Sequence, residues 1–571
     1  MSAGRSSLSR SPIRHGDALV DRARAGVEQA AKQLFAIRRE DGSWRDTLPS
    51  APVATASAVI FLQVADPLGS ADLISAGAAW LRRSQGDDGG WGDAPGAPAT
   101  RNVTPSALAA LALASPQESS HEIERANACI ERLGGIDAIK DRKKTSLFAM
   151  SLVHLSVAGL YEEDRIHRMP VGLSLFPQSF RHRVSFILPI VFSWGVMQTH
   201  TRQGFLFRTL GRFCEPRILD YFEELAKFHG PDGGFEESPL VVSLVGLSFA
   251  RAGVQPHTVD QCVRYLRNSV RADGSWSVNR DLELSATTWV TQGLLDAGHG
   301  VDGSLQSTTA WILESQRQTS FGATGCPAGG WGWSQPSGWP DTDDTANALV
   351  NLVDLGLDRE HPSVRRGLEW LLEMQNRNGS WGCFCKNSLL DLDAPCAAMT
   401  AHAVIALARA GGMKASDDPI ARAVRWFESQ QHADGQIPCL WYRPPTAGTA
   451  AALDALGCVD LADSRTAIRC RDWLFEHQSA SGGWGDGASA TATAEETAWA
   501  LLGLLGAHVD PCHPAVEKGI EWLLERQRSD GSWDAAILGV YFMDLFYSDD
   551  LLATGYALQA IARYVAAQTA W

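Results

Sequence analysis

The segment with the clearest chemical potential is Pro340-Asp341-Thr342-Asp343-Asp344-Thr345, which places three carboxylates within four positions. Because like charges this close cannot all ionise easily, the pKa of at least one carboxyl is expected to rise, so that one acid keeps its proton at neutral pH. Trp331, Trp333 and Trp339 precede the segment, and the faces of aromatic rings attract cations. A protonated acid among aromatic rings is suited to protonating an alkene and to stabilising the cation that results.

Two simpler interpretations of the same segment stay open on the motif alone. Aspartate is favoured at and near helix N-caps, so the three carboxylates could serve to begin a helix. Short acidic motifs also match metal sites by chance. The remainder of the chain has to decide between these alternatives and catalysis.

Composition restricts the class of protein. The chain has 571 residues and a net charge of −15, which fits two large domains or a repeat array and argues against nucleic acid as a partner. Its 11 cysteines include one close pair, Cys383 and Cys385, without the second pair of a structural zinc site, so we expect reduced thiols and no metal. The longest apolar run, residues 184–197, is too short to span a membrane, and residues 1–16 lack the apolar stretch of a secretory signal. We expect a cytoplasmic protein.

An internal repeat predicts the architecture. A glutamine is followed six positions later by a tryptophan, with glycine two positions before the tryptophan, at Gln85/Trp91, Gln375/Trp381, Gln478/Trp484 and Gln527/Trp533. Degenerate copies occur near Trp44, Phe235, Trp276, Trp331 and Ile437, at a spacing of roughly fifty residues. Helical patterns flank each turn, so each unit is helix, turn, helix. We expect most repeat tryptophans to pack on the preceding helix, and the glutamines to bond free backbone groups at helix ends.

The repeat and the acidic segment together resemble the squalene-hopene cyclase family, the protonation-initiated class II terpene cyclases, over nearly the whole chain. Residues 134–136, 169–171, 175–177 and 204–208 follow in the order of further family landmarks. The resemblance implies an all-α fold of two α/α-barrel (toroid) domains with QW-type repeats. Residues 1–39 would be a disordered tail plus the first helix of the catalytic domain, 40–280 the inserted barrel, and 281–571 the catalytic barrel carrying the DTDD segment.

By this resemblance Asp343 is the proton donor, with Asp341 and Asp344 as its carboxylate neighbours. His402, in Met399-Thr400-Ala401-His402, would stabilise the conjugate base of the donor. The aromatic residues Trp333, Trp441, Phe384 and Phe186 would line the substrate pocket. No cofactor is required for the protonation step.

Several positions depart from the family pattern. Ser285 occupies the place of a large pocket tryptophan, Pro445 that of a tyrosine bonded to the acid, and Ala398 that of an acidic residue before the histidine. Arg443 follows Trp441, and Arg181 and Arg183 precede Phe186; these side chains could hold a diphosphate or could be solvated surface charge.

The departures favour a hydrophobic isoprenoid substrate other than squalene. We slightly prefer a prenyl diphosphate of fifteen or twenty carbons. Magnesium could be involved if the substrate is a diphosphate. The alternative is cyclisation of squalene itself. Residues Gly204 to Phe213 resemble the family's membrane-docking helix, which implies peripheral (monotopic) membrane contact, and a homodimer stays open. A non-catalytic or prenyltransferase-like α-barrel is the alternative from another class, but no convincing zinc-ligand set accompanies it.

Overall fold

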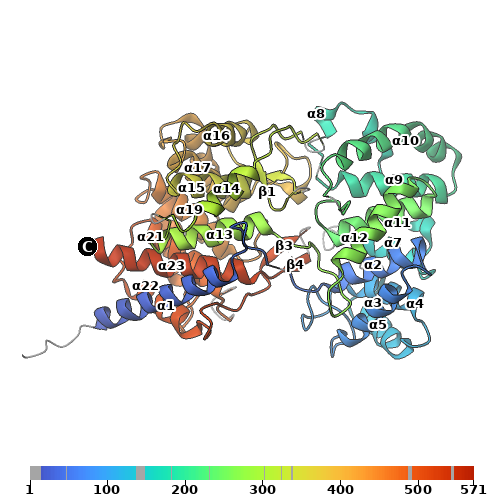
Figure 1. Ribbon diagram of the computed structural model, residues 1–571, viewed down its shortest axis with the longest axis horizontal. Helices are drawn as coiled ribbons and strands as arrows, with labels where there is room; N and C mark the ends of the chain where they lie inside the picture. Colours follow the sequence, from blue (N-terminus) through green and yellow to red (C-terminus); the bar gives the residue numbers. More distant parts are fainter. Residues whose placement is uncertain are drawn as a thin grey trace, which may run out of the picture.

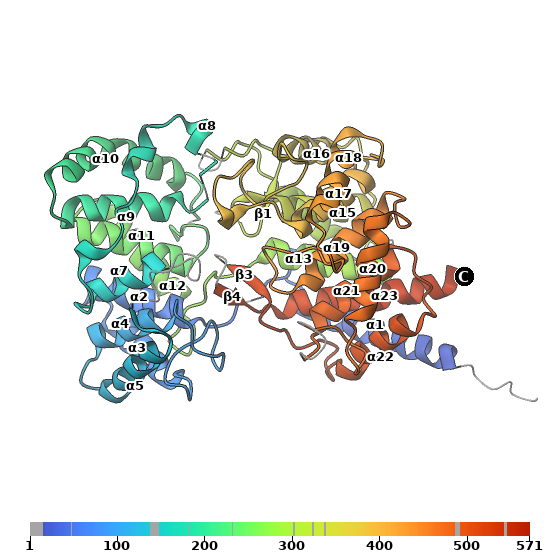
Figure 2. The same cartoon turned by 180° about the vertical axis from the view of Figure 1, so that it is seen from behind.

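The computed structural model describes residues 15–570, except for residues 47, 137–147, 182, 185, 231, 301–302, 323–324, 336–337, 486–490 and 542–544. Within the described residues the chain is predominantly helical, with two short antiparallel strand pairs. Figure 1 shows two helical bodies side by side, and Figure 2 shows the same arrangement from behind. The all-α fold that the sequence predicts is confirmed.

A closed ring of helices forms the inside of the body built mainly from the C-terminal half. Its members contact one another in turn and the last returns to the first: α13 (Glu283–Asp296), α15 (Thr342–Asp354), α17 (Ala397–Arg409), α19 (Pro445–Cys458), α21 (Ala494–Gly506) and α23 (Asp550–Ala570). These helices are buried along most of their length. An outer layer packs around them, consisting of α14 (Gln306–Glu314), α16 (Pro362–Met374), α18 (Asp418–Gln430), α20 (Arg465–Glu476), α22 (Pro514–Arg526) and α1 (His15–Ile37). The two layers make an α/α barrel.

The other body repeats this scheme with residues that lie between α1 and α13 in the sequence. Its inner helices contact one another in the order α7 (Phe148–Val157), α4 (Thr104–Ala114), α2 (Pro52–Ala65), α11 (Pro239–Ala252) and α9 (Leu188–Thr201). Outside them lie α3 (Ala71–Arg83), α5 (Ser120–Arg132), α10 (Phe205–Ala226) and α12 (Pro256–Ser269). Short helical segments occur at η1 (Glu163–Arg165), η2 (Val171–Leu175) and α8 (Gln178–Arg181), and η3 (Asp391–Asp393) lies in the first body.

The N-terminal helix belongs to the outer layer of the C-terminal body, because α1 packs against α22 and α23. The chain therefore forms one outer helix of the C-terminal barrel first, then the helices of the other barrel, and then the rest of the C-terminal barrel. The domain boundaries at residues 39/40 and 280/281 stay predictions.

The repeat turns hold neighbouring helices together through hydrogen bonds. The indole Nε1 of each regular repeat tryptophan donates to the backbone carbonyl ten positions earlier, as Trp381 does to Leu371 at 2.8 Å and Trp484 to Leu474 at 2.7 Å. Gln375 donates to the carbonyls of Gly379 and Pro419, both at 2.8 Å, and so joins its own turn to the next outer helix. The backbone N–H of Trp381 also donates to the hydroxyl of Thr400 on an inner helix, at 3.0 Å. These bonds confirm that the repeats staple adjacent helices.

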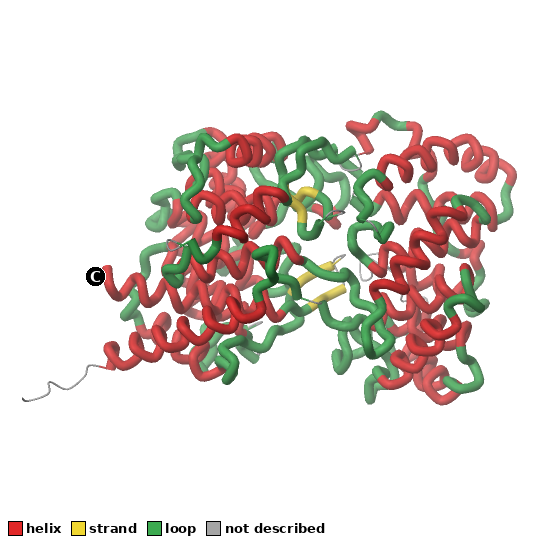
Figure 3. The backbone as a smooth tube through the Cα atoms, in the orientation of Figure 1, coloured by secondary structure: helices red, strands yellow, loops and turns green. Residues whose placement is uncertain are grey.

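Both strand pairs lie where the C-terminal body faces the other body (Figure 3). One pair joins β1 (Trp331–Gly332) to β2 (Pro340–Asp341), with Trp331 opposite Asp341. The other joins β3 (Gly539–Tyr541) to β4 (Leu545–Tyr547). Each pair therefore brings polar or aromatic side chains to the region between the barrels. Among the described helices, none combines the length and the apolar character needed to cross a membrane.

Candidate active site

The aspartate segment forms the junction between β2 and α15. Asp341 ends the strand and is the N-cap of the helix, and its carboxylate accepts a hydrogen bond from the backbone N–H of Asp344 at 2.8 Å. Helix capping, one of the alternatives left open by the sequence, is therefore one role of Asp341. Because Asp343 and Asp344 occupy the first turn of an inner helix, their carboxyl groups also lie near the positive end of the helix dipole.

The carboxyl group of Asp343 is the most extensively bonded of the three. Its Oδ1 contacts Nδ1 of His402 in α17 and accepts from Nδ2 of Asn347 at 3.1 Å. Its Oδ2 lies 3.4 Å from the hydroxyl of Tyr442. The structure thus brings Asp343 and His402 together, and it supplies a tyrosine partner from a residue that the sequence analysis did not select. Although Pro445 stands where the family has a tyrosine, Tyr442 supplies a hydroxyl to Asp343 from the loop before α19.

Burial acts most strongly on the other two carboxyls. The pKa of Asp341 is raised well above its ordinary value by burial and by the neighbouring Asp344. Burial raises the pKa of Asp344 to about 7 even though hydrogen bonds from Asp341 and Ser285 act in the opposite direction. The hydroxyl of Ser285 donates to Oδ1 of Asp344 at 2.8 Å. Ser285 therefore supports a carboxyl group of the cluster, a role that its position in the sequence did not reveal.

The imidazole of His402 is set up to carry a positive charge. Burial lowers its pKa, but the charge and the hydrogen bond of Asp343 raise it, and Cys396 and Asp454 add to the rise, so that the net shift is upward. Asp454 lies in α19, and it provides an acidic neighbour that the alanine at position 398 does not. The net upward shift of its pKa favours the imidazolium form of His402 beside Asp343.

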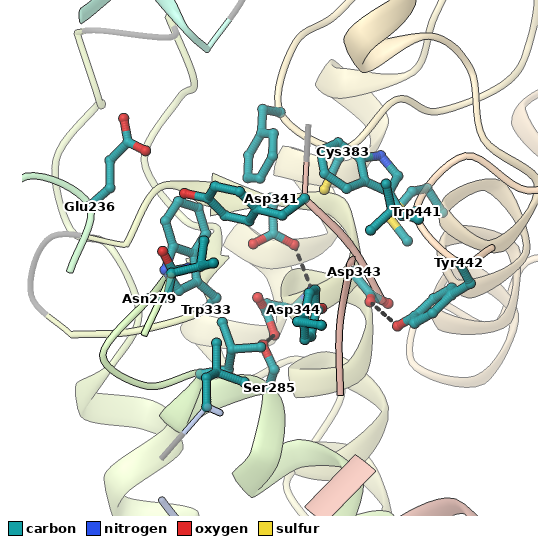
Figure 4. A pocket seen from close by; sticks show the side chains of 18 of the residues that line it. Glu236, Asn279, Ser285, Trp333, Asp341, Asp343, Asp344, Cys383, Trp441 and Tyr442 are labelled. Atoms are coloured by element: carbon teal, nitrogen blue, oxygen red, sulfur yellow. Dashed lines mark hydrogen bonds between the residues drawn. The ribbon is translucent and has the colours of Figure 1, made fainter. Parts of the chain in front are cut away.

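A cavity opens in front of this cluster and comprises about 820 Å³ of space between its lining atoms, part of it open to solvent. Asp341, Asp343 and Asp344 line it, and Figure 4 shows their side chains directed into it. Five of the six residues that the sequence predicts for substrate binding also line it: Phe186, Ser285, Trp333, Phe384 and Trp441. The acidic cluster and the aromatic residues that the sequence predicts therefore line one cavity.

The aromatic residues of the cavity form one cluster centred on Phe384. Its ring centre lies 5.5 Å from that of Trp333, 5.5 Å from that of Trp441 and 4.7 Å from that of Phe186. Since aromatic faces stabilise a desolvated cation by about 2 kcal/mol each, such a cluster can stabilise positive charge that moves along a bound chain.

Arg443 is not brought to the cavity. Its side chain is exposed, and its guanidinium lies 5.2 Å from the ring centre of Phe546. Within the described chain, no Lys or Arg is among the lining residues of this cavity. Nor does the described part of the chain hold a group of three or more His, Cys, Asp or Glu side chains suited to a metal ion.

Sequence reasoning missed several lining residues on loops and on the β3–β4 pair, namely Glu236, Asn279, Tyr442, Tyr541 and Tyr547. The C-terminal aromatics Tyr541 and Tyr547 could have been suspected from their clustering, but their register depends on strand pairing. The other three lie in loops whose direction the repeat pattern does not determine.

Relatives of known name share this organisation. A squalene-hopene cyclase of Zymomonas mobilis is 24% identical over 98% of this chain and 97% of its own length. A drimenyl diphosphate synthase of Streptomyces showdoensis is 28% identical over 42% of this chain and 45% of that protein. The chain spans about half the length of several other curated relatives that it matches. The solved ent-copalyl diphosphate synthase from Streptomyces platensis shares the fold, with a TM-score of 0.61 at 19% identity over 95% of this chain and 99% of that one.

The two bodies also match family models. Residues 27–187 match the squalene-hopene cyclase N-terminal domain, and residues 283–566 match the squalene-hopene cyclase C-terminal domain. The second match includes the aspartate cluster, His402 and the ring of inner helices. Together the two matches show that the chain belongs to the squalene-hopene cyclase family.

Proposed function

We propose that the protein cyclises a linear polyprenyl chain by protonating its terminal alkene with Asp343. The observation that carries this proposal is that Asp343 lines the cavity while its Oδ1 is bonded to His402 and Asn347. The Oδ1 atom is thereby committed to protein donors, which leaves Oδ2 to hold the reacting proton. Family membership sets aside the alternative of a non-catalytic or prenyltransferase-like barrel.

The proton transfer follows from this geometry. The O–H bond at Oδ2 breaks, the alkene π electrons form a new C–H bond, and a tertiary carbocation remains on the substrate. The carboxylate left behind is stabilised by the imidazolium of His402 and by the hydroxyl of Tyr442. A positioned acid of this kind contributes about 10²- to 10⁴-fold in rate.

Asp341 and Asp344 act as positioning residues for this acid. Because burial favours their neutral forms, they place little negative charge beside Asp343. Through the bond from its backbone N–H to Asp341, Asp344 also fixes the first turn of α15, which carries Asp343. The aromatic cluster around Phe384 then stabilises successive cations and folds the chain.

For the substrate we favour a prenyl diphosphate of fifteen or twenty carbons. A drimenyl diphosphate synthase is among the relatives of the chain. Tyr221 is not among the lining residues of this cavity, but its phenol interacts electrostatically with Glu236, which is, and with Arg181. Tyr221 and Arg181 line a second pocket, so Arg181 is a candidate to hold the diphosphate of a chain whose terminal alkene lies at Asp343. Magnesium stays an expectation tied to this substrate, as does diphosphate binding by Arg443.

Squalene is the second candidate, and two observations favour it. Apart from Ser285 and Asn279, the cavity is lined by apolar, aromatic and acidic residues, and the described lining includes no Lys or Arg. In addition, α10 presents an exposed apolar face, on which Phe205 and Leu206 are each 82% exposed. Such a face could reach a membrane in which squalene is dissolved.

The test is incubation with farnesyl diphosphate, geranylgeranyl diphosphate and squalene, with product analysis before and after phosphatase treatment. We expect cyclic diphosphates that are released as alcohols by phosphatase, and no cyclic product from Asp343→Asn. Wild-type turnover in Asp343→Asn would refute the donor assignment, and conversion of squalene alone would establish the second candidate.

The head-group site can be located with two arginine variants. If Arg181 holds the diphosphate, Arg181→Ala should raise KM for the diphosphate by roughly 10- to 150-fold, since a charge-assisted bond contributes about 1.5–3 kcal/mol. Arg443→Ala is the matched control and also tests the assignment made from the sequence. An increase with Arg443→Ala alone would place the diphosphate at Arg443 instead.

A further inference from the structure

Two consecutive glutamates lie in an unusual backbone conformation at the cavity. Glu236 and Glu237, in the loop before α11, have φ values of 57° and 51°, in the left-handed region that residues other than glycine rarely adopt. Both are buried, with 7% and 2% of their surface exposed. Strained conformations and buried carboxyls each cost free energy, and they are often retained where they position a functional group.

The two glutamates differ in their partners. Glu237 forms an ion pair with Arg280 at 3.0 Å and accepts from the hydroxyl of Tyr265 at 3.4 Å. Glu236 has no hydrogen-bond or ion-pair partner among the described residues, and its carboxyl group lines the cavity. Glu237 therefore anchors the turn, whereas Glu236 is an acidic residue at the wall of the cavity.

The position of Glu236 is opposite to that of the proton donor. Figure 4 shows Glu236 on one side of the pocket and Asp343 with Tyr442 on the other, with Trp333 and Asp341 between them. Asn279 lies on the Glu236 side, and its Oδ1 is buried without a hydrogen-bond partner. On this side of the cavity, the Glu236 carboxyl and the Asn279 carbonyl thus have no hydrogen-bond donor among the residues that the structure describes.

From this arrangement we infer that Glu236 is the general base that ends the cyclisation. The inference rests on the proposed function, because it requires a carbocation that moves from Asp343 toward Glu236. The carboxylate takes a proton from the carbon next to the last cationic centre, the electrons of that C–H bond form the alkene, and Glu236 becomes a neutral acid. The carbonyl dipole of Asn279 stabilises the cation before this step. One proton leaves Asp343 and one reaches Glu236 in each turnover, and exchange with solvent restores both groups.

The neighbours of Glu236 leave it as the titrating group on this side. Tyr221 from α10 and Tyr541 from β3 interact with it, and burial raises the pKa of both phenols well above their ordinary value, so that they stay neutral. Arg181 also interacts electrostatically with Tyr221. Burial raises the pKa of Glu236 to about 8. The carboxylate fraction therefore increases as the pH rises through 8, and the share of alkene products should increase with it.

The first experiment compares Glu236→Gln with the matched variant Glu237→Gln, using farnesyl diphosphate, geranylgeranyl diphosphate and squalene. In Glu236→Gln we expect total substrate consumption within about threefold of wild type, but at least a tenfold fall in the ratio of alkene to alcohol products, because water captures the final cation. Glu237→Gln weakens the ion pair that anchors the turn but keeps the Glu236 carboxyl, so it should change the ratio much less than Glu236→Gln does. An unchanged ratio in folded Glu236→Gln would overturn the inference, and so would complete loss of consumption, since Glu236 would then act before the cation forms.

A second measurement needs no turnover and therefore separates this inference from the proposed function. Dodecyltrimethylammonium carries an apolar chain and a fixed positive charge, and its binding can be followed by calorimetry at pH 6 and pH 9. We expect Glu236→Gln to bind it at least fivefold more weakly than wild type at pH 9 and equally well at pH 6, where Glu236 is neutral. Glu237→Gln keeps the Glu236 carboxylate and should bind it more tightly than Glu236→Gln at pH 9. Equal binding by wild type and Glu236→Gln at pH 9 would overturn the assignment of Glu236.

Discussion

Replacement of His402 by alanine tests the central contact of the site. The variant removes the imidazole bonded to Oδ1 of Asp343 without altering the cavity lining, because His402 is not among the lining residues. Only 16% of the His402 side chain and 14% of the Asp343 side chain are exposed, so solvent compensates poorly for the lost contact. The conjugate base formed by proton transfer would lose its cationic partner.

The size of the effect follows from the charges. Two unit charges about 4 Å apart attract by about 4 kcal/mol at an effective dielectric constant of 20, which corresponds to roughly a thousandfold in rate. The attraction exists only after Asp343 has given up its proton, so the loss appears in kcat rather than in KM. We therefore expect kcat to fall by roughly 10²- to 10⁴-fold, with the product pattern nearly unchanged.

The assay is steady-state product formation across pH, with His200→Ala as the matched control. His200 is bonded to Glu215 at 3.0 Å, and its side chain is 13% exposed, so it is a similar pair away from the cavity. Because the pKa of His402 is raised, its cation is fully present below its ordinary value of 6.5 and is lost as the pH rises through the folded value. Wild-type kcat should fall over that range, and this step should be missing in His402→Ala. A changed product pattern at an unchanged kcat, or an equal loss in His200→Ala, would refute the reasoning.

Three further predictions concern stability and surfaces. Asp344→Asn should raise the melting temperature at pH 8 but not at pH 4. A carboxyl whose folded pKa is raised to about 7 destabilises the fold once it ionises, by on the order of a few kcal/mol. An equal change at both pH values would contradict this. Trp484→Phe should lower the free energy of unfolding by about 1–3 kcal/mol, because the carbonyl of Leu474 loses its donor, and denaturant titration measures the change. Phe205→Ser combined with Leu206→Ser should weaken sedimentation with phospholipid vesicles while leaving turnover of detergent-dispersed substrate intact; unchanged sedimentation would mean that α10 does not dock on a bilayer.

The sequence alone determined the helical architecture, because the repeat carries its own local physics. In the repeat turn, the side chain of Gln375 donates to backbone carbonyls, and the indole of Trp381 donates to the carbonyl of the residue ten positions earlier. The same bonds can be expected wherever the spacing recurs in the sequence. The aspartate segment and His402 were predicted for the same reason, since their motifs are short and contiguous in the chain.

Only the tertiary structure decided which side chains meet at the cavity. The contacts of Tyr442 with Asp343 and of Ser285 with Asp344 join residues that lie 99 and 59 positions apart, so no local pattern records them. Burial shifts the pKa of Asp341, Asp344 and Glu236 only after the two barrels remove water from around them. Closeness in the sequence can also mislead. Arg443 lies two positions after Trp441, which lines the cavity, but the Arg443 side chain does not line it and lies near Phe546 instead.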